Sequence, residues 1–154
     1  EGEGVKLLDI DYDKYAHGEA VLGWLNGTLS LTAAEQACWD VLLKDIMNGI
    51  ARSVARENLH VGHIKVIVEN GKQYAVGNIT GDASTMQLRG TAGTSDHAKL
   101  IVNARVETTP EHLDEIVRQV LLEAIGDRCE DEVLAWRYLQ PGRPNPTHRM
   151  GLEA

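Results

Sequence analysis

The sequence is poor in the features that mark secreted or membrane-spanning proteins. Its 154 residues contain only two cysteines, Cys38 and Cys129, which are too few for a disulfide-stapled scaffold. No apolar run approaches the length needed to cross a bilayer, and the opening Glu1-Gly2-Glu3-Gly4 lacks the basic character of a signal peptide. We therefore expect both thiols to be reduced, no membrane as a partner, and a cytoplasmic location.

Basic residues are also scarce, because 15 Lys and Arg stand against 23 Asp and Glu, and the formal net charge is -8. A charge of this sign repels a phosphate backbone. The sequence therefore argues against nucleic acid and against anionic membranes as partners.

Signatures of nucleotide binding and of catalysis are missing as well. A phosphate-binding loop needs glycines followed by Lys and Ser or Thr at the start of a helix, and the Gly-containing stretches 77–81 and 90–95 lack the Lys. Ser, Cys and His occur without a nucleophile elbow or a recognisable catalytic spacing. We expect no cofactor in this chain itself and assign no catalytic residue to it.

What the sequence does contain is ordinary globular composition, with 43% apolar and 25% charged residues, and a length that suits one domain. Gly23 and Gly27 fall on the expected core side of the first strand, which predicts close approach of a helix or a bulge there. Apolar alternation predicts strands over residues 21–31, 64–68, 73–80, 100–106 and 133–139, the last at an edge of the sheet.

Turn residues suggest how these strands are connected. Asn70-Gly71 is the preferred pair for a type I′ hairpin turn between the second and third strands. The stretch from Gly81 to His97 is rich in Gly, Ser, Thr and Asp and predicts a long mobile connection, with a short strand-like piece at Met86 to Arg89.

The first helix is expected to begin after Thr32. Thr32 is a good N-cap, and Glu35, three residues later, completes a capping box. The helical pattern continues to about Asn58 and places Cys38 on the buried face. The expected core stripe is Ala34, Cys38, Val41, Leu42, Ile46, Gly49, Ile50 and Val54.

The second helix has clearer boundaries. Thr109 is the expected N-cap, Pro110 suits the first helical position, and Gly126 is placed to end the helix. The expected core stripe is Leu113, Ile116, Val117, Val120, Leu121, Ala124 and Ile125.

This order of elements predicts the α+β class. The arrangement that fits it best is a ferredoxin-like two-layer sandwich, a mainly antiparallel sheet with two helices on one face and an extended Pro-rich C-terminal tail. Residues 1–18 are expected to form an acidic lead-in, residues 19–139 a single α+β domain, and residues 140–154 an extended Pro/Arg tail.

Two histidines are the candidate metal ligands. His60 and His63 have the HxxH spacing that can hold a transition metal if both rings face one way. They flank Gly62 at a helix-to-strand junction, and a closed site needs further ligands that the sequence does not specify. The alternative is that both are polar loop residues.

The tail is the candidate partner-binding segment. Pro141, Pro144 and Pro146 favour an extended backbone, which lowers the ordering cost of docking. Arg143, His148 and Arg149 add positive charge at the end of an acidic chain. The alternative is a terminus with no partner.

Three stretches carry a family resemblance: YAHGEAVLGWLN at 15–26, TTP at 108–110 and PGRPNPTHR at 141–149. Together they resemble the region after the GTPase domain in some members of the CobW/cobalamin-synthesis family of P-loop GTPases. The resemblance implies GTP, and a divalent metal or corrinoid, only through a parent protein, with another domain or a target enzyme as partner. This chain lacks the family's phosphate loop, guanine-reading motif and Cys-rich metal motif, so no catalytic residue carries over.

Three functions remain open at this point. The leading hypothesis is a non-catalytic accessory or interaction domain in a CobW-like GTPase involved in metal or cobalamin cofactor delivery, with self-association left open. The first residue is Glu1 instead of Met, which favours a processed product or a piece of a longer protein. The second is a small-molecule or metal-binding domain that uses the uncovered sheet face with His60 and His63. The third is a small stand-alone enzyme with its site between Gly81 and His97.

Overall fold

The computed structural model describes residues 21–81 and 85–141. All helices and strands of this part lie inside the expected 19–139 segment, and the Pro/Arg tail beyond residue 141 lies outside it. The elements are β1 (Leu22–Cys38), α2 (Trp39–Arg56), β2 (Val61–Glu69), β3 (Tyr74–Gly81), β4 (Gln87–Thr91), β5 (Thr94–Glu107), α3 (Pro110–Ile125) and β6 (Glu130–Leu139).

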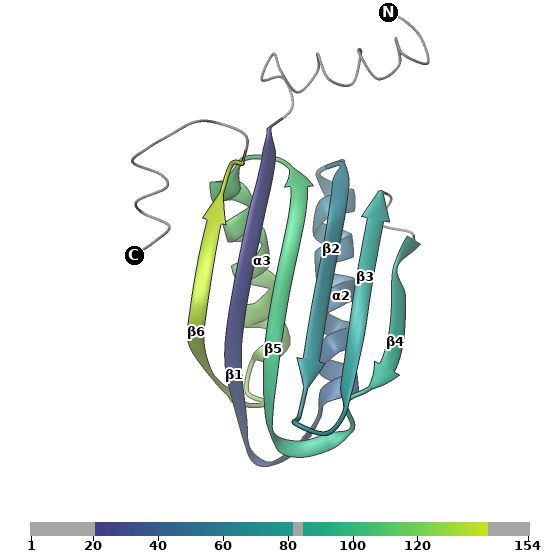
Figure 1. The fold of residues 1–154 in the computed structure, drawn as a ribbon, viewed down its shortest axis with the longest axis vertical. Helices are drawn as coiled ribbons and strands as arrows, with labels where there is room; N and C mark the ends of the chain where they lie inside the picture. Colours follow the sequence, from purple (N-terminus) through teal and green to yellow (C-terminus); the bar gives the residue numbers. More distant parts are fainter. Residues whose placement is uncertain (1–20, 82–84, 142–154) are drawn as a thin grey trace, which may run out of the picture.

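The strands form one six-stranded sheet in the order β4-β3-β2-β5-β1-β6, and every neighbouring pair is antiparallel. Both helices lie behind this sheet, on one face (Figure 1). The predicted α+β class, antiparallel sheet and helix-covered face are therefore confirmed. None of the described helices is long and apolar enough to cross a membrane.

The core lies between the sheet and the two helices. The predicted alternation in β1 is confirmed, because the odd-numbered residues from Gly23 to Leu31 are buried while the even-numbered ones from Leu22 to Ser30 are partly exposed. The side chains that fill the core from α2 are Trp39, Leu42, Leu43, Ile46, Met47, Ile50 and Val54.

Two glycines of β1 allow close packing. A Cβ at Gly23 would lie 2.9 Å from the Thr108 carbonyl oxygen, so the turn before α3 needs a glycine there. A Cβ at Gly27 would lie 2.5 Å from the ring of Trp136 in β6. The expected close approach of a helix is confirmed at Gly23, whereas at Gly27 an indole takes the space.

Helix α3 matches its sequence signals. The Thr109 side chain accepts a hydrogen bond from the His112 backbone N–H at 3.1 Å, and Pro110 is the first helical residue. Gly126 ends the helix with φ of 47°, and its N–H donates to the Leu122 carbonyl at 3.1 Å. All seven residues of the predicted core stripe are buried.

Helix α2 begins later than predicted. Strand β1 continues to Cys38, because Ala37 and Cys38 pair with Ser95 and Thr94 of β5. Thr32 is therefore a strand residue and not an N-cap, and the helix ends at Arg56. Cys38 is an exposed N-cap residue, Ala34 is an exposed strand residue and Val41 is an exposed helix residue, so these three do not belong to the core stripe.

The predicted long connection from Gly81 to His97 is also wrong. The strand-like piece is β4, and β5 begins as early as Thr94; only residues 82–84 of this stretch lie outside the described residues. Strand β4 pairs with β3, and the first residues of β5 pair with the end of β1. Backbone pairing beyond the local sequence therefore gives this Gly-rich stretch its structure.

The β2–β3 hairpin forms at the predicted place with a different turn. Gly71 has a positive φ of 96°, but Asn70 does not, which rules out a type I′ turn at this pair. Asn70 Oδ1 instead accepts hydrogen bonds from the backbone N–H groups of Lys72 and Gln73, both at 3.0 Å. The loop is thus an Asx-type turn that spans residues 70–73.

Candidate functional site

The face of the sheet opposite the helices, here called the open face, carries a continuous polar row across all six strands. Neighbouring members are register partners, so their side chains stand side by side on the pleat. The row, here called the amide row, is Arg137, Asn26, Asn103, Lys65, Asn78 and Gln87, from β6 to β4.

The amide row contains residue types that β-strands disfavour. Asn is depleted in β-strands, yet Asn26, Asn103 and Asn78 occupy inner strands of the sheet. Within the described residues only Asn78 of this row has a side-chain partner, since its Oδ1 lies 3.0 Å from Nε2 of His63. The other amide and cationic groups are therefore available to a ligand.

A second row lies beside the first. Arg105 of β5 is the register partner of both Trp24 in β1 and His63 in β2. The Arg105 guanidinium carbon lies 4.1 Å from the centroid of the Trp24 ring, a cation–π contact. The indole is thus covered by a cation and offers no bare stacking platform.

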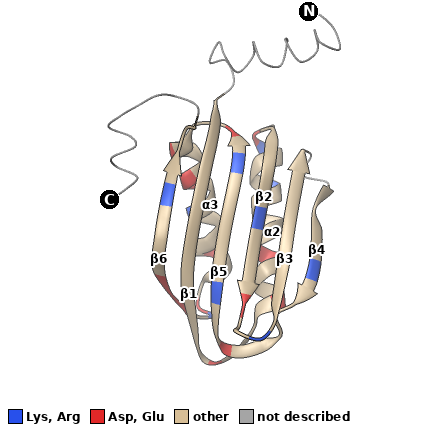
Figure 2. Cartoon of the chain, viewed as in Figure 1, with Lys and Arg blue, Asp and Glu red and all other residues tan. Residues whose placement is uncertain are grey.

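The charge on the open face differs from that of the whole chain. Figure 2 shows blue ribbon segments, which mark Lys and Arg, within β6, β5, β2 and β4, and red segments near the ends of the strands. The carboxylates on this face, Glu69, Glu107, Glu130 and Glu132, lie toward the ends of the strands, and the amide row itself has no carboxylate. The cations on the face are Lys65, Arg89, Lys99, Arg105 and Arg137.

The chemistry of these two rows is that of binding. Amides both donate and accept hydrogen bonds, whereas Lys and Arg only donate, so these two rows have an excess of donors and of positive charge. The open-face rows described here contain no Ser or Cys nucleophile beside a base, which acyl-transfer or hydrolytic chemistry would need. This arrangement matches an extended ligand that carries carboxylates.

The two predicted metal ligands, His60 and His63, lie in different parts of the structure. His63 lies on the open face with its Nε2 at hydrogen-bond distance from Asn78. His60 is exposed in the loop before β2, and its backbone carbonyl accepts a hydrogen bond from Glu107 N–H at 2.8 Å. No group of three or more His, Cys, Asp or Glu side chains able to hold a metal occurs among the described residues. The HxxH spacing therefore gains no further ligand from the fold.

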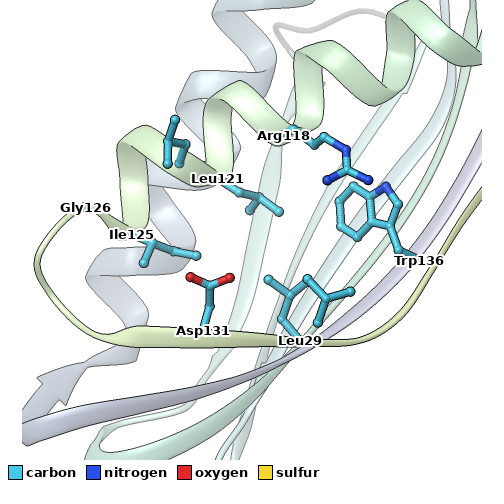
Figure 3. Close-up of a pocket in the computed structure, with 9 residues that line it drawn as sticks. Leu29, Arg118, Leu121, Ile125, Gly126, Asp131 and Trp136 are labelled. Carbon is cyan, nitrogen blue, oxygen red and sulfur yellow. The ribbon is translucent and has the colours of Figure 1, made fainter.

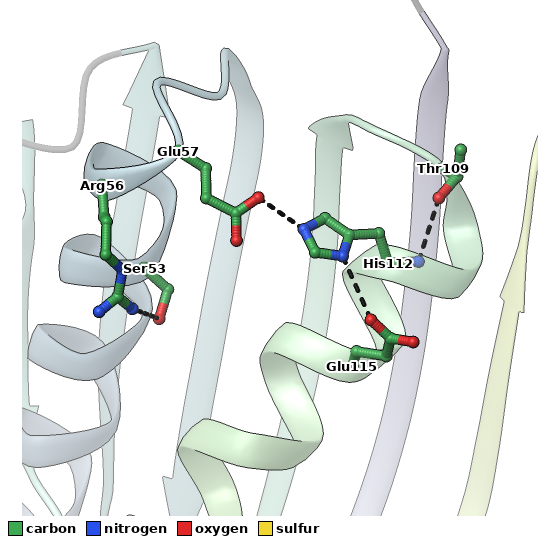
Figure 4. Close-up of polar contacts among 6 residues, drawn as sticks. All are labelled: Ser53, Arg56, Glu57, Thr109, His112 and Glu115. Carbon is green, nitrogen blue, oxygen red and sulfur yellow. Dashed lines mark hydrogen bonds and ion pairs between the residues drawn. The ribbon is translucent and has the colours of Figure 1, made fainter.

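A third polar cluster joins the two helices (Figure 4). His112 Nε2 lies 2.6 Å from Glu57 Oε1, and His112 Nδ1 lies 3.3 Å from Glu115 Oε1. The hydrogen bond to Glu57 raises the pKa of His112 above its ordinary value; burial opposes this, and the bond to Glu115 adds to the rise. Because the cluster is exposed and links the end of α2 to α3, it acts as an ionic bridge between helices.

A hollow of about 290 Å³ opens between α3 and β6 (Figure 3). The Trp136 indole N–H donates to Asp114 Oδ1 at 2.7 Å, and the Arg118 guanidinium lies over the Trp136 ring at 4.9 Å. Beyond Arg118, Gly126 and Asp131 the lining is apolar: Leu29, Leu121, Leu122, Ile125, Val133 and Trp136.

The open-face site was not predicted residue by residue. Its detectable signal was the placement of Asn26, Asn78 and Asn103 inside strands, which is unfavourable unless the side chain has a use. The predicted partner-binding residues Arg143, His148 and Arg149 lie outside the described residues. Comparison of the chain with models of protein families, with curated proteins and with solved structures gives no match.

Proposed function

We propose that this chain is a non-catalytic interaction domain whose open face binds an acidic surface of another domain or protein. One observation carries the proposal: the amide row presents cations and amides, of which only Asn78 has a side-chain partner in the described residues, without a carboxylate, on a chain whose formal net charge is -8. Such a local reversal of charge steers and orients a partner of opposite sign.

The dimensions of the face suit a protein partner. Six strands at the usual spacing of about 4.8 Å put the outer strands about 24 Å apart. A standard protein interface covers about 800 Å² on each partner, a patch of similar width. Nucleic acid is the less favoured polyanion, because Arg105 covers the Trp24 ring and leaves no bare aromatic surface there for base stacking.

The proposal also covers the fold family, the cellular location and the parent protein. The order β2-β5-β1-β6 supports a ferredoxin-like fold to which the β3–β4 hairpin is added beside β2. The free thiols of Cys38 and Cys129 support a cytoplasmic location. The resemblance to CobW-like GTPases supports the GTPase domain or a target enzyme as the acidic partner, with GTP and the metal or corrinoid bound outside this chain.

Titration with an acidic peptide tests the proposed function. A ten-residue mixed Glu/Asp peptide, added to the full chain, is expected to shift backbone NMR signals of β1, β5 and β2 and to bind more weakly as salt rises. Lys65→Glu and Arg105→Glu should each weaken binding about tenfold or more, because each replaces an attraction by a repulsion. Arg52→Glu, on the exposed side of α2, is the matched control for the change in charge.

Two results would overturn the proposed function. One is an equal loss of peptide binding in the Arg52→Glu control, which would mean that only net charge matters. The other is tighter binding of a single-stranded oligonucleotide than of the acidic peptide, which would assign the open face to nucleic acid.

A further inference from the structure

Strands β6 and β4 are the two edges of the sheet, and they differ in a way that bears on self-association. Strand β4 has five residues and is interrupted by Gly90 with φ of 79°, as is usual for a protected edge. Strand β6 has ten residues and no positive φ. Strand β6 has one bulge, at Leu134, but it is the only edge of this sheet long enough to serve as a template for another strand.

The charges along β6 are distributed so that a second β6 strand, running antiparallel beside it, would place opposite charges next to each other. Its first residues are Glu130, Asp131 and Glu132, and its cation, Arg137, lies near the other end. Glu132 and Arg137 have no hydrogen bond or ion pair within the described part of the chain. Antiparallel pairing of two β6 strands brings opposite charges together, whereas parallel pairing would align like charges.

The order in which β6 residues point to the open face and to the helix side is also the same when the strand is followed in either direction from its centre. Glu132 and Arg137 are register partners of Ser30 and Asn26 and stand on the open face. Val133 and Trp136 stand on the helix side, where both line the hollow beside α3. A bulge between them adds Leu134 next to Ala135, and both line an open-face depression with Asn26.

We infer that two copies of this chain pair through β6 in an antiparallel, two-fold symmetric arrangement centred between Leu134 and Ala135. This register places Glu132 opposite Arg137 twice, both on the open face, and Val133 opposite Trp136 twice, both on the helix side. An isologous contact of this kind is self-complementary and closed. The inference rests on β6 and not on the proposed binding of an acidic partner, with which it shares only Arg137 of the amide row.

Exposed apolar side chains near β6 also support a second copy of the chain as the partner at this edge. Val133 and Leu134 are 51% and 52% exposed, and Leu122 of α3, beside the hollow in Figure 3, is 70% exposed. Continuing the sheet through β6 brings the two α3 helices together on one face, because α3 lies behind β1 and β6 (Figure 1). Leu122 and Val133 of each copy then face apolar side chains of the other.

Charge reversal at the pair of residues tests this inference. Sedimentation of the full chain over about 5 to 200 µM should give a mass of about twice 16.9 kDa at the upper end. Glu132→Arg and Arg137→Glu should each raise the dimer dissociation constant about tenfold or more, because two attractive pairs become repulsive. The double variant, Glu132→Arg with Arg137→Glu, should recover the dimer, because each new Arg then faces a new Glu.

Controls separate this outcome from misfolding and from the acidic-partner proposal. Arg89→Glu on the other edge should leave the mass unchanged, and circular dichroism melts should show each variant folded. Lys65→Glu should weaken peptide binding without changing the mass. A chain that is monomeric at every concentration, or a double variant as weak as the single ones, would overturn the β6 pairing.

Discussion

The guanidinium of Arg105 lies over the ring of Trp24, 4.1 Å from its centroid, while the indole N–H of the same Trp24 is buried without a hydrogen-bond partner in the described part of the chain. Trp136, on the other side of the sheet, has a similar cation above its ring but donates its N–H to Asp114 at 2.7 Å. The two tryptophans therefore differ in one interaction, the hydrogen bond.

The first prediction compares these two indoles. Trp136→Phe should lower the free energy of unfolding by about 1 to 3 kcal/mol, because it leaves Asp114 without its donor and shrinks the ring. Trp24→Phe should cost about 1 kcal/mol less than that, since it also removes an unsatisfied N–H. Urea denaturation of both variants measures the difference; equal costs would mean that the Trp24 N–H is satisfied in solution.

The second prediction concerns Asp40 in the first turn of α2. Its carboxylate accepts from the backbone N–H of Ala92 at 2.8 Å and of Gly93 at 3.1 Å, and from the Thr91 hydroxyl at 2.7 Å. Burial by itself would raise the pKa of this carboxyl, but the three hydrogen bonds outweigh burial and hold the pKa below its ordinary value.

Asp40→Asn should therefore destabilise the fold by about 1 to 3 kcal/mol at neutral pH, because the amide cannot accept all three bonds. Asp45→Asn, which removes only an exposed ion pair with Arg128, should cost about 0 to 1 kcal/mol. The Asp40 contribution is present above the ordinary carboxyl pKa of 3.8 and disappears as the pH falls through the lowered value. Denaturation curves that show the same cost for both variants would refute the Asp40 anchor.

The third prediction is a pH dependence that arises from His112. Because Glu57 and Glu115 raise the pKa of His112 in the folded chain, the protonated ring stabilises the fold. This contribution is complete below the ordinary pKa of 6.5 and is lost as the pH rises through the raised value. His112→Gln should flatten the fall in melting temperature between about pH 6 and pH 8.

Two further variants check the source of that slope. Glu57→Gln should flatten it as well, because the hydrogen bond to Glu57 is the largest cause of the shift. Glu111→Gln, in the same turn of α3 but outside the cluster of Figure 4, should leave it unchanged. If the Glu111 variant flattens the slope as much as the Glu57 variant, the effect belongs to the general charge of the helix.

The fourth prediction distinguishes the two thiols. Burial raises the pKa of Cys129, Asp131 raises it further, and Arg128 opposes both, whereas Cys38 is exposed at the start of α2. Since the thiolate is the reactive form, iodoacetamide at pH 8 should modify Cys38 roughly threefold faster than Cys129, or more. Peptide mass spectrometry at timed intervals gives both rates, and faster labelling of Cys129 would contradict this order.

The parts of the fold that were predictable have local causes. The boundaries of α3 depend on Thr109, Pro110 and Gly126, each of which acts on backbone groups within a few residues, and all three act as expected. The start of α2 depends instead on contacts across the chain. Thr32 and Glu35 fit a capping box, but pairing of residues 37–38 with β5 keeps the backbone extended until Cys38.

The candidate site shows the same division. Most members of the amide row fall in predicted strands, so the pleat direction of Asn26 or Lys65 followed from alternation alone. Their alignment into one row depends on the strand order and on five register relationships, three of which join segments far apart in the sequence. Gln87 falls in the predicted strand-like piece at Met86 to Arg89, but its Gly- and Ser-rich surroundings gave no sign that this piece pairs with β3.

The pairing of Trp24 with Leu139 has a practical consequence for engineering. It places the start of β1 beside the end of β6, at one end of the sheet, as Figure 1 shows. A short linker can therefore join these two strands, and new termini can be opened at Gly71, where a Cβ would meet no atom within 4 Å. Such a circular permutant would keep every strand pair, and the same geometry allows the unit to be inserted into a surface loop of a host protein.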